Sequence, residues 1–198
     1  MKETDTNTHP VIDLSGGADV FDFTGGYDTG SIKKFIDQGG RAVGGYNENR
    51  KEMYLAPQYQ NKRNIHMGID FWAPAGEPVY AALDGFIAYK AFHNQTGNYG
   101  ATIVLKHQWK GESIFALYGH LSLASLKKAE PGSPVKAGDV VGWLGDESEN
   151  GEWPPHLHYQ LSLKDPGEAD MPGVVSKDER EKALKIYPDP RIILGQIY

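Results

Sequence analysis

The chain has 198 residues, of which 39% are hydrophobic, and a formal net charge of −6 at pH 7. It contains no cysteine, which excludes disulfides, thiolate nucleophiles and cysteine-ligated zinc, so any metal must be bound by His, Asp or Glu. Acidic and basic residues are interspersed, and neither a basic stripe for nucleic acid nor an acidic tail is present. The length suits one domain with a substantial hydrophobic core.

Residues 1–62 are expected to form an irregular extension that packs on the core. The turn-rich stretch "SGGADVFDFTGGYDTG" precedes "SIKKFIDQ" at 31–38, for which we expect a short helix. No apolar run has the length of a signal peptide or a membrane span. The sequence therefore predicts a cytoplasmic protein, or a periplasmic or extracellular one if a leader has been removed. A monomer is assumed.

Strand-forming segments are dense from residue 65 onward, and we place the core domain at residues 63–165. Six segments combine strand length with β-branched or aromatic residues, and Gly, Pro, Asn or Asp separates them. These segments are "PVYAA" (78–82), "GFIAYKAF" (85–92), "ATIVLKH" (101–107), "SIFALYGH" (113–120), "VVGWL" (140–144) and "HLHYQLSL" (156–163). The sequence predicts a mainly β fold, a small twisted antiparallel β-sheet or open sandwich with short peripheral helices.

The remaining residues, 166–198, are expected to form a helix and a tail. In "SKDEREKALKIY", Ser176 is followed three residues later by Glu179, which is the pattern of a helix capping box. The following "PDP" should end that helix.

The segment "WPPHLHYQL" at 153–161 places two histidines two residues apart at the start of a predicted strand. Residues two apart in a strand point to the same face, so His156 and His158 should share one environment. From this segment alone, solvent or packing is a better explanation than a metal ion.

A second segment, "IHMGIDFWAPAG", contains His66 and Asp70 four residues apart. A straight strand would separate them by about 13 Å, too far for one ion whose ligands lie at ~2 Å. The segment is a poor helix, so the two side chains can meet only if the chain bends. Gly68 could supply the bend, because glycine adopts dihedrals that other residues avoid.

Together these residues could form a catalytic metal site. His66, Asp70 and His158 would make a three-ligand zinc site with an open fourth position. His156 and His120 could then transfer protons beside it.

Three segments, "HMGID", "YGHLS" and "PHLHYQL", resemble in order the signature segments of the lysostaphin/LytM-type zinc metallopeptidases, which are peptidoglycan endopeptidase-like. The resemblance implies a small antiparallel β fold, one Zn²⁺ per chain, and hydrolysis of peptide bonds in peptidoglycan stem peptides or cross-bridges. His66, Asp70 and His158 match the family's zinc ligands. His120 and His156 match the catalytic histidines that handle the proton and stabilise the tetrahedral intermediate.

These segments, with the flanking "GGYNENR" and "PDPRIILG", look closest to a branch found inside larger fusion proteins, between phosphotransferase-like and aminotransferase domains. The resemblance to that branch does not identify a substrate. Two alternatives therefore stay open: a cytoplasmic hydrolase of a small peptide or amide metabolite, and a non-catalytic binding or regulatory module of the same fold. No ligand position is lost, which favours the enzyme.

Four residues are weaker candidates for binding the peptide or peptidoglycan-derived substrate. Tyr59 lies upstream of the first ligand, roughly where the family places a tyrosine that assists the oxyanion, although simple packing explains it equally well. Tyr46 and Arg50 could line the cleft, with a structural salt bridge as the alternative for "GYNENR". Trp153 could form a cleft wall. No nucleic-acid or membrane partner is predicted.

The loop that precedes the two-histidine strand is acidic. An acidic rim would favour substrates with a free amine and would repel exposed carboxylates. The residues concerned are Asp146, Glu147, Glu149 and Glu152.

Overall fold

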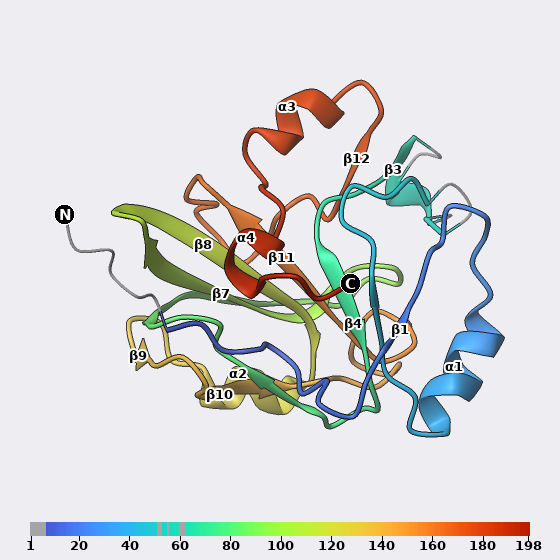
Figure 1. The fold of residues 1–198 in the computed structure, drawn as a ribbon, viewed down its shortest axis with the longest axis horizontal. Helices are drawn as coiled ribbons and strands as arrows, with labels where there is room; N and C mark the ends of the chain where they lie inside the picture. The colour runs from blue at the N-terminus through green and yellow to red at the C-terminus, as the bar shows by residue number, and fades with distance from the viewer. Residues whose placement is uncertain (1–6, 51–52, 55, 60–61) are drawn as a thin grey trace.

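The computed structural model describes residues 7–50, 53–54, 56–59 and 62–198. It confirms the mainly β fold, with an eight-stranded main sheet of order β1-β2-β4-β11-β8-β7-β6-β9 (Figure 1). Its strands are β1 (Asp19–Val20), β2 (Ala42–Gly44), β4 (Ile69–Trp72), β11 (His156–Ser162), β8 (Glu112–Leu121), β7 (Gly100–Trp109), β6 (Gly85–His93) and β9 (Pro134–Val135). The β1–β2 pair is parallel and the other described pairs are antiparallel.

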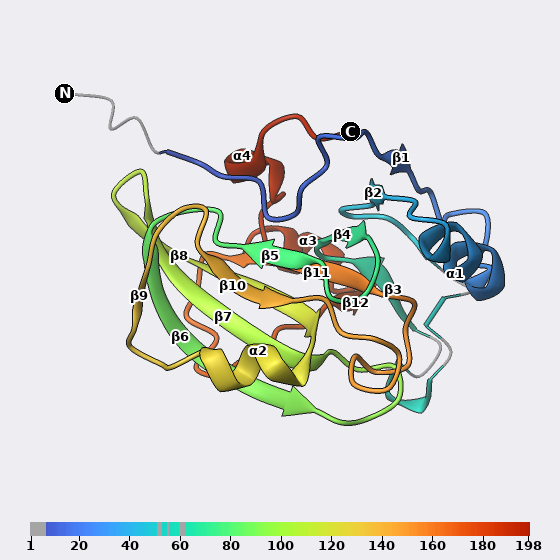
Figure 2. The ribbon, with the colours of Figure 1, turned by 90° about the horizontal axis from the view of Figure 1, so that it is seen from below.

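The described residues also form two short two-stranded sheets. The strand β10 (Val140–Trp143) pairs with β5 (Pro78–Tyr80), and β12 (Val174–Ser176) pairs with β3 (Arg63–His66). Figure 2 shows the β5–β10 pair lying across the long curved strands β6, β7 and β8. The main hydrophobic core lies between these layers, because side chains of all five strands belong to one buried cluster. Each of the six predicted strand segments contains an observed strand.

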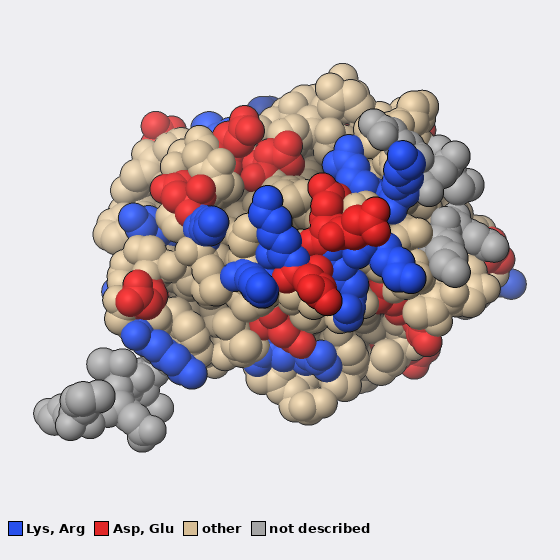
Figure 3. Space-filling view, turned by 90° about the horizontal axis from the view of Figure 1, so that it is seen from above, with Lys and Arg blue, Asp and Glu red and all other residues tan. Residues whose placement is uncertain are grey.

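Short helices lie around this β body. They are α1 (Thr29–Asp37), the 3₁₀ turn η1 (Pro57–Tyr59), α2 (Leu123–Lys128), α3 (Arg180–Leu184) and α4 (Arg191–Leu194). None of the helices in the described part of the chain is long and apolar enough to cross a membrane. On the face shown in Figure 3, acidic and basic side chains are mixed, in keeping with their interspersed order in the sequence.

Both predicted helices form, and both differ from the expected bounds, since α1 spans Thr29–Asp37 rather than 31–38. The helix α1 is capped by Asp28, whose carboxylate accepts from the Gly30 N–H at 3.1 Å, and it buries Ile32 and Ile36. The predicted capping box also forms: the backbone N–H of Glu179 donates to the hydroxyl of Ser176 at 3.3 Å, and the backbone N–H of Ser176 donates to the carboxylate of Glu179 at 3.1 Å. These bonds close a turn that precedes the helix, and α3 starts only at residue 180.

The N-terminal segment is more regular than expected. It supplies β1 and β2, which extend the main sheet beyond β4, and α1 lies beside them at that end of the molecule (Figure 1). The aromatic side chains of Phe23 and Trp72 join the buried residues of α1 in a second hydrophobic cluster. Residues far upstream of the histidine motifs therefore pack against the strand that carries Asp70.

Candidate active site

The pairing of three central strands brings the first two expected ligands together. The strand β11 lies between β4 and β8, and His158 is directly opposite Asp70 on one side and Gly119 on the other. Residues directly opposite each other in a sheet point to the same face. The Nδ1 atom of His158 consequently lies 3.1 Å from Oδ1 of Asp70.

The third expected ligand, His66, comes from the small β3–β12 sheet. The chain leaves β3 at this residue and enters β4 at Ile69, so it bends between the two sheets. The bend places Nε2 of His66 3.2 Å from Oδ1 of Asp70 and 2.9 Å from Nδ1 of His158. The bend therefore allows His66 and Asp70, four residues apart, to share one ion, as predicted from the sequence.

Gly68 lies at this bend, but the predicted reason for a glycine there is wrong. Its φ is not among the positive values that glycine alone adopts easily. A Cβ at this position would lie 2.6 Å from Cε1 of His158 and 2.8 Å from the carbonyl oxygen of Tyr159. The glycine is needed because the His158 ring occupies the space that a side chain would fill.

Hydrogen bonds on the outer side of both imidazoles fix their tautomers. His66 donates from Nδ1 to the carbonyl of Gly45 at 3.0 Å, and His158 donates from Nε2 to Oε1 of Gln160 at 2.9 Å. Burial lowers the pKa of His66 to about 4, so that imidazole is neutral at pH 7. The inner nitrogen of His66 then carries a lone pair directed at the Asp70 carboxylate, and Nδ1 of His158 faces the same carboxylate.

Asp70 is ionised in this setting. Burial alone would raise its pKa, but the neighbouring His66 and the guanidinium of Arg50 outweigh that effect and hold the pKa well below its usual range. Two imidazole nitrogens and one anionic oxygen therefore converge within 3.2 Å of one another. Electron-rich atoms at this distance repel one another unless a cation binds between them. The spacing is close to that of zinc ligands, because tetrahedral ligands at ~2.1 Å from zinc would lie roughly 3.4 Å apart. The donor set fits a zinc ion.

A bulge directs His120 into the same site. Gly119 shares the face of His158, so strict alternation would turn the next side chain, His120, to the opposite face. The pairing of β7 with β8 shifts near this end, and His120 has a φ of 61°, in the left-handed region. A β-bulge of this kind re-aims a side chain. The ring of His120 lies 4.2 Å from that of His156, centroid to centroid.

These two histidines keep one nitrogen unused. His120 donates from Nδ1 to the carbonyl of Asn150 at 2.8 Å, and His156 donates from Nδ1 to the carbonyl of Pro154 at 2.8 Å. Trp72 stacks on His156 with 20° between the planes. Burial lowers the pKa of both imidazoles, and for His120 the neighbouring His156 lowers it further. Each is therefore a neutral base with Nε2 available.

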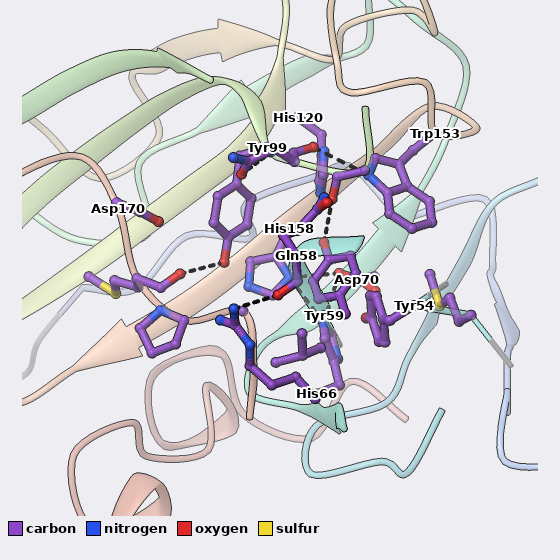
Figure 4. A pocket seen from close by; sticks show the side chains of 18 of the residues that line it. Tyr54, Gln58, Tyr59, His66, Asp70, Tyr99, His120, Trp153, His158 and Asp170 are labelled. Carbon is purple, nitrogen blue, oxygen red and sulfur yellow. Dashed lines mark hydrogen bonds and ion pairs between the residues drawn. The ribbon is translucent and has the colours of Figure 1, made fainter. Parts of the chain in front are cut away.

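A cavity of about 420 Å³ opens above these groups (Figure 4). In this view Trp153 and Asp170 lie on opposite sides of His158, and the Tyr99 ring stands between Asp170 and His120. The cavity is lined by all five histidine and aspartate candidates and by Met53, Tyr54, Gln58, Tyr59, Arg63, Gly97, Asn98, Tyr99, Trp153, Glu168, Asp170, Met171, Pro172, Gly173 and Val174.

Two of the four candidate substrate residues line this cavity. Tyr59 donates its hydroxyl hydrogen bond to the carbonyl of Gly97, and burial raises its pKa to about 12. Trp153 donates from its indole N–H to the carbonyl of Asn98 at 3.3 Å. Both side chains are therefore held in place as cavity walls.

Tyr46 and Arg50 do not line the cavity, which corrects the expectation that they read substrate charge. The hydroxyl of Tyr46 donates to the carbonyl of Tyr187 at 2.6 Å. Arg50 is fully buried, and its guanidinium is paired with Asp70 and Glu48. The alternative reading of "GYNENR", a structural salt bridge, describes Arg50 better.

The expected acidic rim is also absent from the lining of this cavity. The four loop acids accept hydrogen bonds from neighbouring residues instead. They are Asp146, Glu147, Glu149 and Glu152. Besides Asp70, the acids that line the cavity are Glu168 and Asp170, from the segment that follows β11. These four carboxylates therefore give no support to a preference for a substrate with a free amine.

Sequence reasoning missed two contributors to the site. Gln160 was detectable, because it lies two residues after His158 and so shares its face of the strand. Tyr99 directly precedes β7, and its ring centroid lies 5.2 Å from that of His158. Its hydroxyl donates to the carbonyl of Met171 at 2.9 Å. No local pattern marks that tyrosine, because its place depends on how β7 pairs with β8.

The fold and the site together define a β-sheet protein with a candidate metal centre beside two proton-accepting histidines. The family model described as Peptidase family M23 matches residues 64–170, more than half of the chain. The chain belongs to Peptidase family M23, which confirms the family that the three signature segments predicted.

Individual relatives agree with this assignment. The chain is 36% identical over 99 residues to the DD-carboxypeptidase/endopeptidase Mpg of Neisseria meningitidis, a match that covers 50% of this chain and 20% of the relative. It is 35% identical over 99 residues to the peptidoglycan DD-endopeptidase ShyA of Vibrio cholerae, again covering 50% and 20%. The chain thus matches about a fifth of the length of these curated relatives.

Among solved structures, the chain is similar to the catalytic domain of the antimicrobial peptidase lysostaphin from Staphylococcus simulans. The sequences are 23% identical, the TM-score is 0.47, and the match covers 76% of this chain and 97% of that one.

Proposed function

We propose that this protein is a zinc-dependent metallopeptidase that hydrolyses a peptide bond, with peptidoglycan stem peptides or cross-bridges as the substrate class. The observation that carries the proposal is the convergence of His66 Nε2, His158 Nδ1 and Asp70 Oδ1, three potential ligand atoms that lie within 3.2 Å of one another. One Zn²⁺ per chain would be held by these three residues. When bound, zinc supplies Lewis-acid activation of a water molecule and of the scissile carbonyl.

The chain's own residues supply the proton transfers. His120 and His156 are neutral, and each has Nδ1 bound to a backbone carbonyl, so Nε2 faces the cavity as an acceptor. One of them would accept the proton of the attacking water and return it to the leaving amine. The ring that carries this proton would donate it in a hydrogen bond to the oxygen of the tetrahedral intermediate before passing it to the leaving amine, while the other ring stays a neutral acceptor beside it. The backbone carbonyls hold both rings in orientation during this exchange.

The aromatic walls complete the site. Tyr59, Tyr99 and Trp153 line the cavity beside the histidines, and hydrogen bonds to backbone carbonyls fix all three. Fixed walls position the substrate and limit the access of water, which favours reaction over side reactions. The relatives named as DD-endopeptidases support peptidoglycan peptides as the substrate class.

We also propose a division of the chain into an N-terminal extension at 1–62 that packs on the core, a peptidase-like β domain at 63–165, and a C-terminal helix and tail at 166–198. The family match at residues 64–170 supports the limits of the central part.

The function is tested by incubating the purified, zinc-loaded protein with peptidoglycan and with soluble stem-peptide dimers, and by detecting new amino termini by mass spectrometry. We expect cleavage of at least one substrate, loss of cleavage on chelation, and recovery when zinc is added back. Failure of the zinc-loaded protein to cleave either substrate would contradict the proposed substrate class, and cleavage that survives complete zinc removal would contradict the mechanism.

A further inference from the structure

The two oxygens of the Asp70 carboxylate have different partners. Oδ1 faces His66 and His158, as described above. Oδ2 accepts a hydrogen bond from Nη1 of Arg50 at 2.5 Å. Arg50 is fully buried, so this bond is shielded from water and from competing ions.

Arg50 is itself held on several sides. Its Nε pairs with the carboxylate of Glu48. Its guanidinium carbon lies 5.2 Å from the ring centroid of Phe23 and 5.8 Å from that of Trp72. Glu48 in turn accepts from the backbone N–H of Phe23 at 3.1 Å. A guanidinium fixed by a carboxylate and two aromatic rings cannot turn away from Asp70 without breaking these contacts.

The backbone leaves room for this arrangement at one position. A Cβ on Gly45 would lie 2.3 Å from Oε2 of Glu48, and the residue has a φ of 155°. The carbonyl of Gly45 also accepts the outer N–H of His66. The segment "GGYNENR" therefore provides the outer partners of two of the three proposed ligands. It lies upstream of the family match, which begins at residue 64.

We propose that Arg50, held by Glu48, is a positioning residue of the metal centre: it occupies Oδ2 of Asp70 and leaves Oδ1 as the oxygen for the metal. The inference rests on the proposed function, in which His66, Asp70 and His158 bind zinc. Outer partners that orient ligands commonly change metal affinity or activity by about 10–100-fold when they are replaced. A purely structural ion pair would affect folding but not the metal's environment.

The test compares Arg50→Met, Arg50→Lys and Glu48→Gln with the wild type. The matched control is Arg41→Met, which removes another arginine–glutamate pair of the N-terminal segment, with Arg41 2.9 Å from Glu77 and outside the cavity lining. Zinc affinity is measured by competition with a chelator, and the visible absorption spectrum is recorded with Co²⁺ in place of zinc. Circular dichroism checks that each variant is folded.

We expect Arg50→Met and Glu48→Gln to weaken zinc binding by about 10–100-fold and to alter the Co²⁺ spectrum. Arg50→Lys should restore part of both properties, and Arg41→Met should match the wild type. If Arg50→Met does not fold, the lysine and glutamine variants decide the result. Folded Arg50 and Glu48 variants with wild-type affinity and an unchanged spectrum would overturn this inference alone, whereas a wild type that binds no zinc would overturn the proposed function as well.

Discussion

The two pairs of histidines in the cavity are both buried, yet they differ in what their ring nitrogens contact. His66 and His158 have both nitrogens engaged, one by an outer partner and one by the Asp70 group. His120 and His156 have Nδ1 bound to backbone carbonyls and Nε2 directed at the cavity. Burial alone therefore does not assign a role. What distinguishes the proposed metal ligands from the proton-transferring histidines is the surroundings of the ring nitrogen that has no outer partner: it faces Asp70 in the first pair and the cavity in the second.

The outer partners also come from different parts of the chain. The proposed ligands depend on Gly45, from the N-terminal segment, and on Gln160, from the strand β11 itself. The proton-transferring pair depends on Asn150 and Pro154, which belong to the loop before β11. Changes in the two regions should consequently have separable effects on metal binding and on turnover.

The largest effect is expected when either histidine of the proton-transferring pair, His120 or His156, is removed. His120→Ala and His156→Ala should each lower kcat by about 10²–10⁴-fold, because general acid–base catalysis contributes that much. Both variants should keep their zinc, since neither residue belongs to the converging acceptors. Steady-state kinetics on the identified substrate and zinc analysis measure this, with His9→Ala as the control outside the cavity. Near-normal turnover in both variants would show that the role was misassigned.

The second prediction concerns the steric packing of Gly68 against the His158 ring. Gly68→Ala places a methyl group against the His158 ring, and overpacking of this kind costs about 1–3 kcal/mol. We expect a lower free energy of unfolding and weaker zinc binding, measured by denaturant titration and chelator competition. Gly25→Ala is the control, because a Cβ at Gly25 meets no atom within 4 Å. A Gly68 variant as stable and as tight-binding as the control would refute the close contact.

The third prediction, with a smaller expected effect, concerns Gln160, the outer hydrogen-bond partner of the proposed zinc ligand His158. Gln160→Met removes the acceptor that fixes the tautomer of His158, and should reduce zinc affinity by about 10–100-fold. Gln108→Met is the matched control, since Gln108 donates to Ser113 on the exposed surface of β7 and β8. Chelator competition distinguishes them, and equal affinity in both variants would count against a positioning role for Gln160.

Much of the fold followed from local sequence. Strand segments such as 101–107 and 113–120 carry β-branched and aromatic residues between glycine-containing turns, and they form β7 and β8. The strands β1 and β2, at one end of the main sheet, were not predicted, because "DV" and "AVG" are too short to give an alternating pattern. They become strands by pairing with each other and with β4.

The site was predictable where the chemistry lies in a short motif and not where it depends on tertiary contact. His66, Asp70 and His158 stand in recognisable segments, and the structure brings them together. The pairing of Arg50 with Asp70 spans twenty residues and joins an irregular segment to the strand β4, so spacing gave no indication of it. The loop acids near residue 150 were close in sequence to the two-histidine strand, but side-chain direction took them away from the cavity.

The central claim is that one histidine of "HLH" holds the metal while the other serves the chemistry beside it. The most direct test is the zinc content of the wild type, His158→Ala and His156→Ala, purified side by side and dialysed against a weak chelator. We predict about one zinc per chain in the wild type and in His156→Ala, and almost none in His158→Ala. Equal zinc in the two variants would contradict the account.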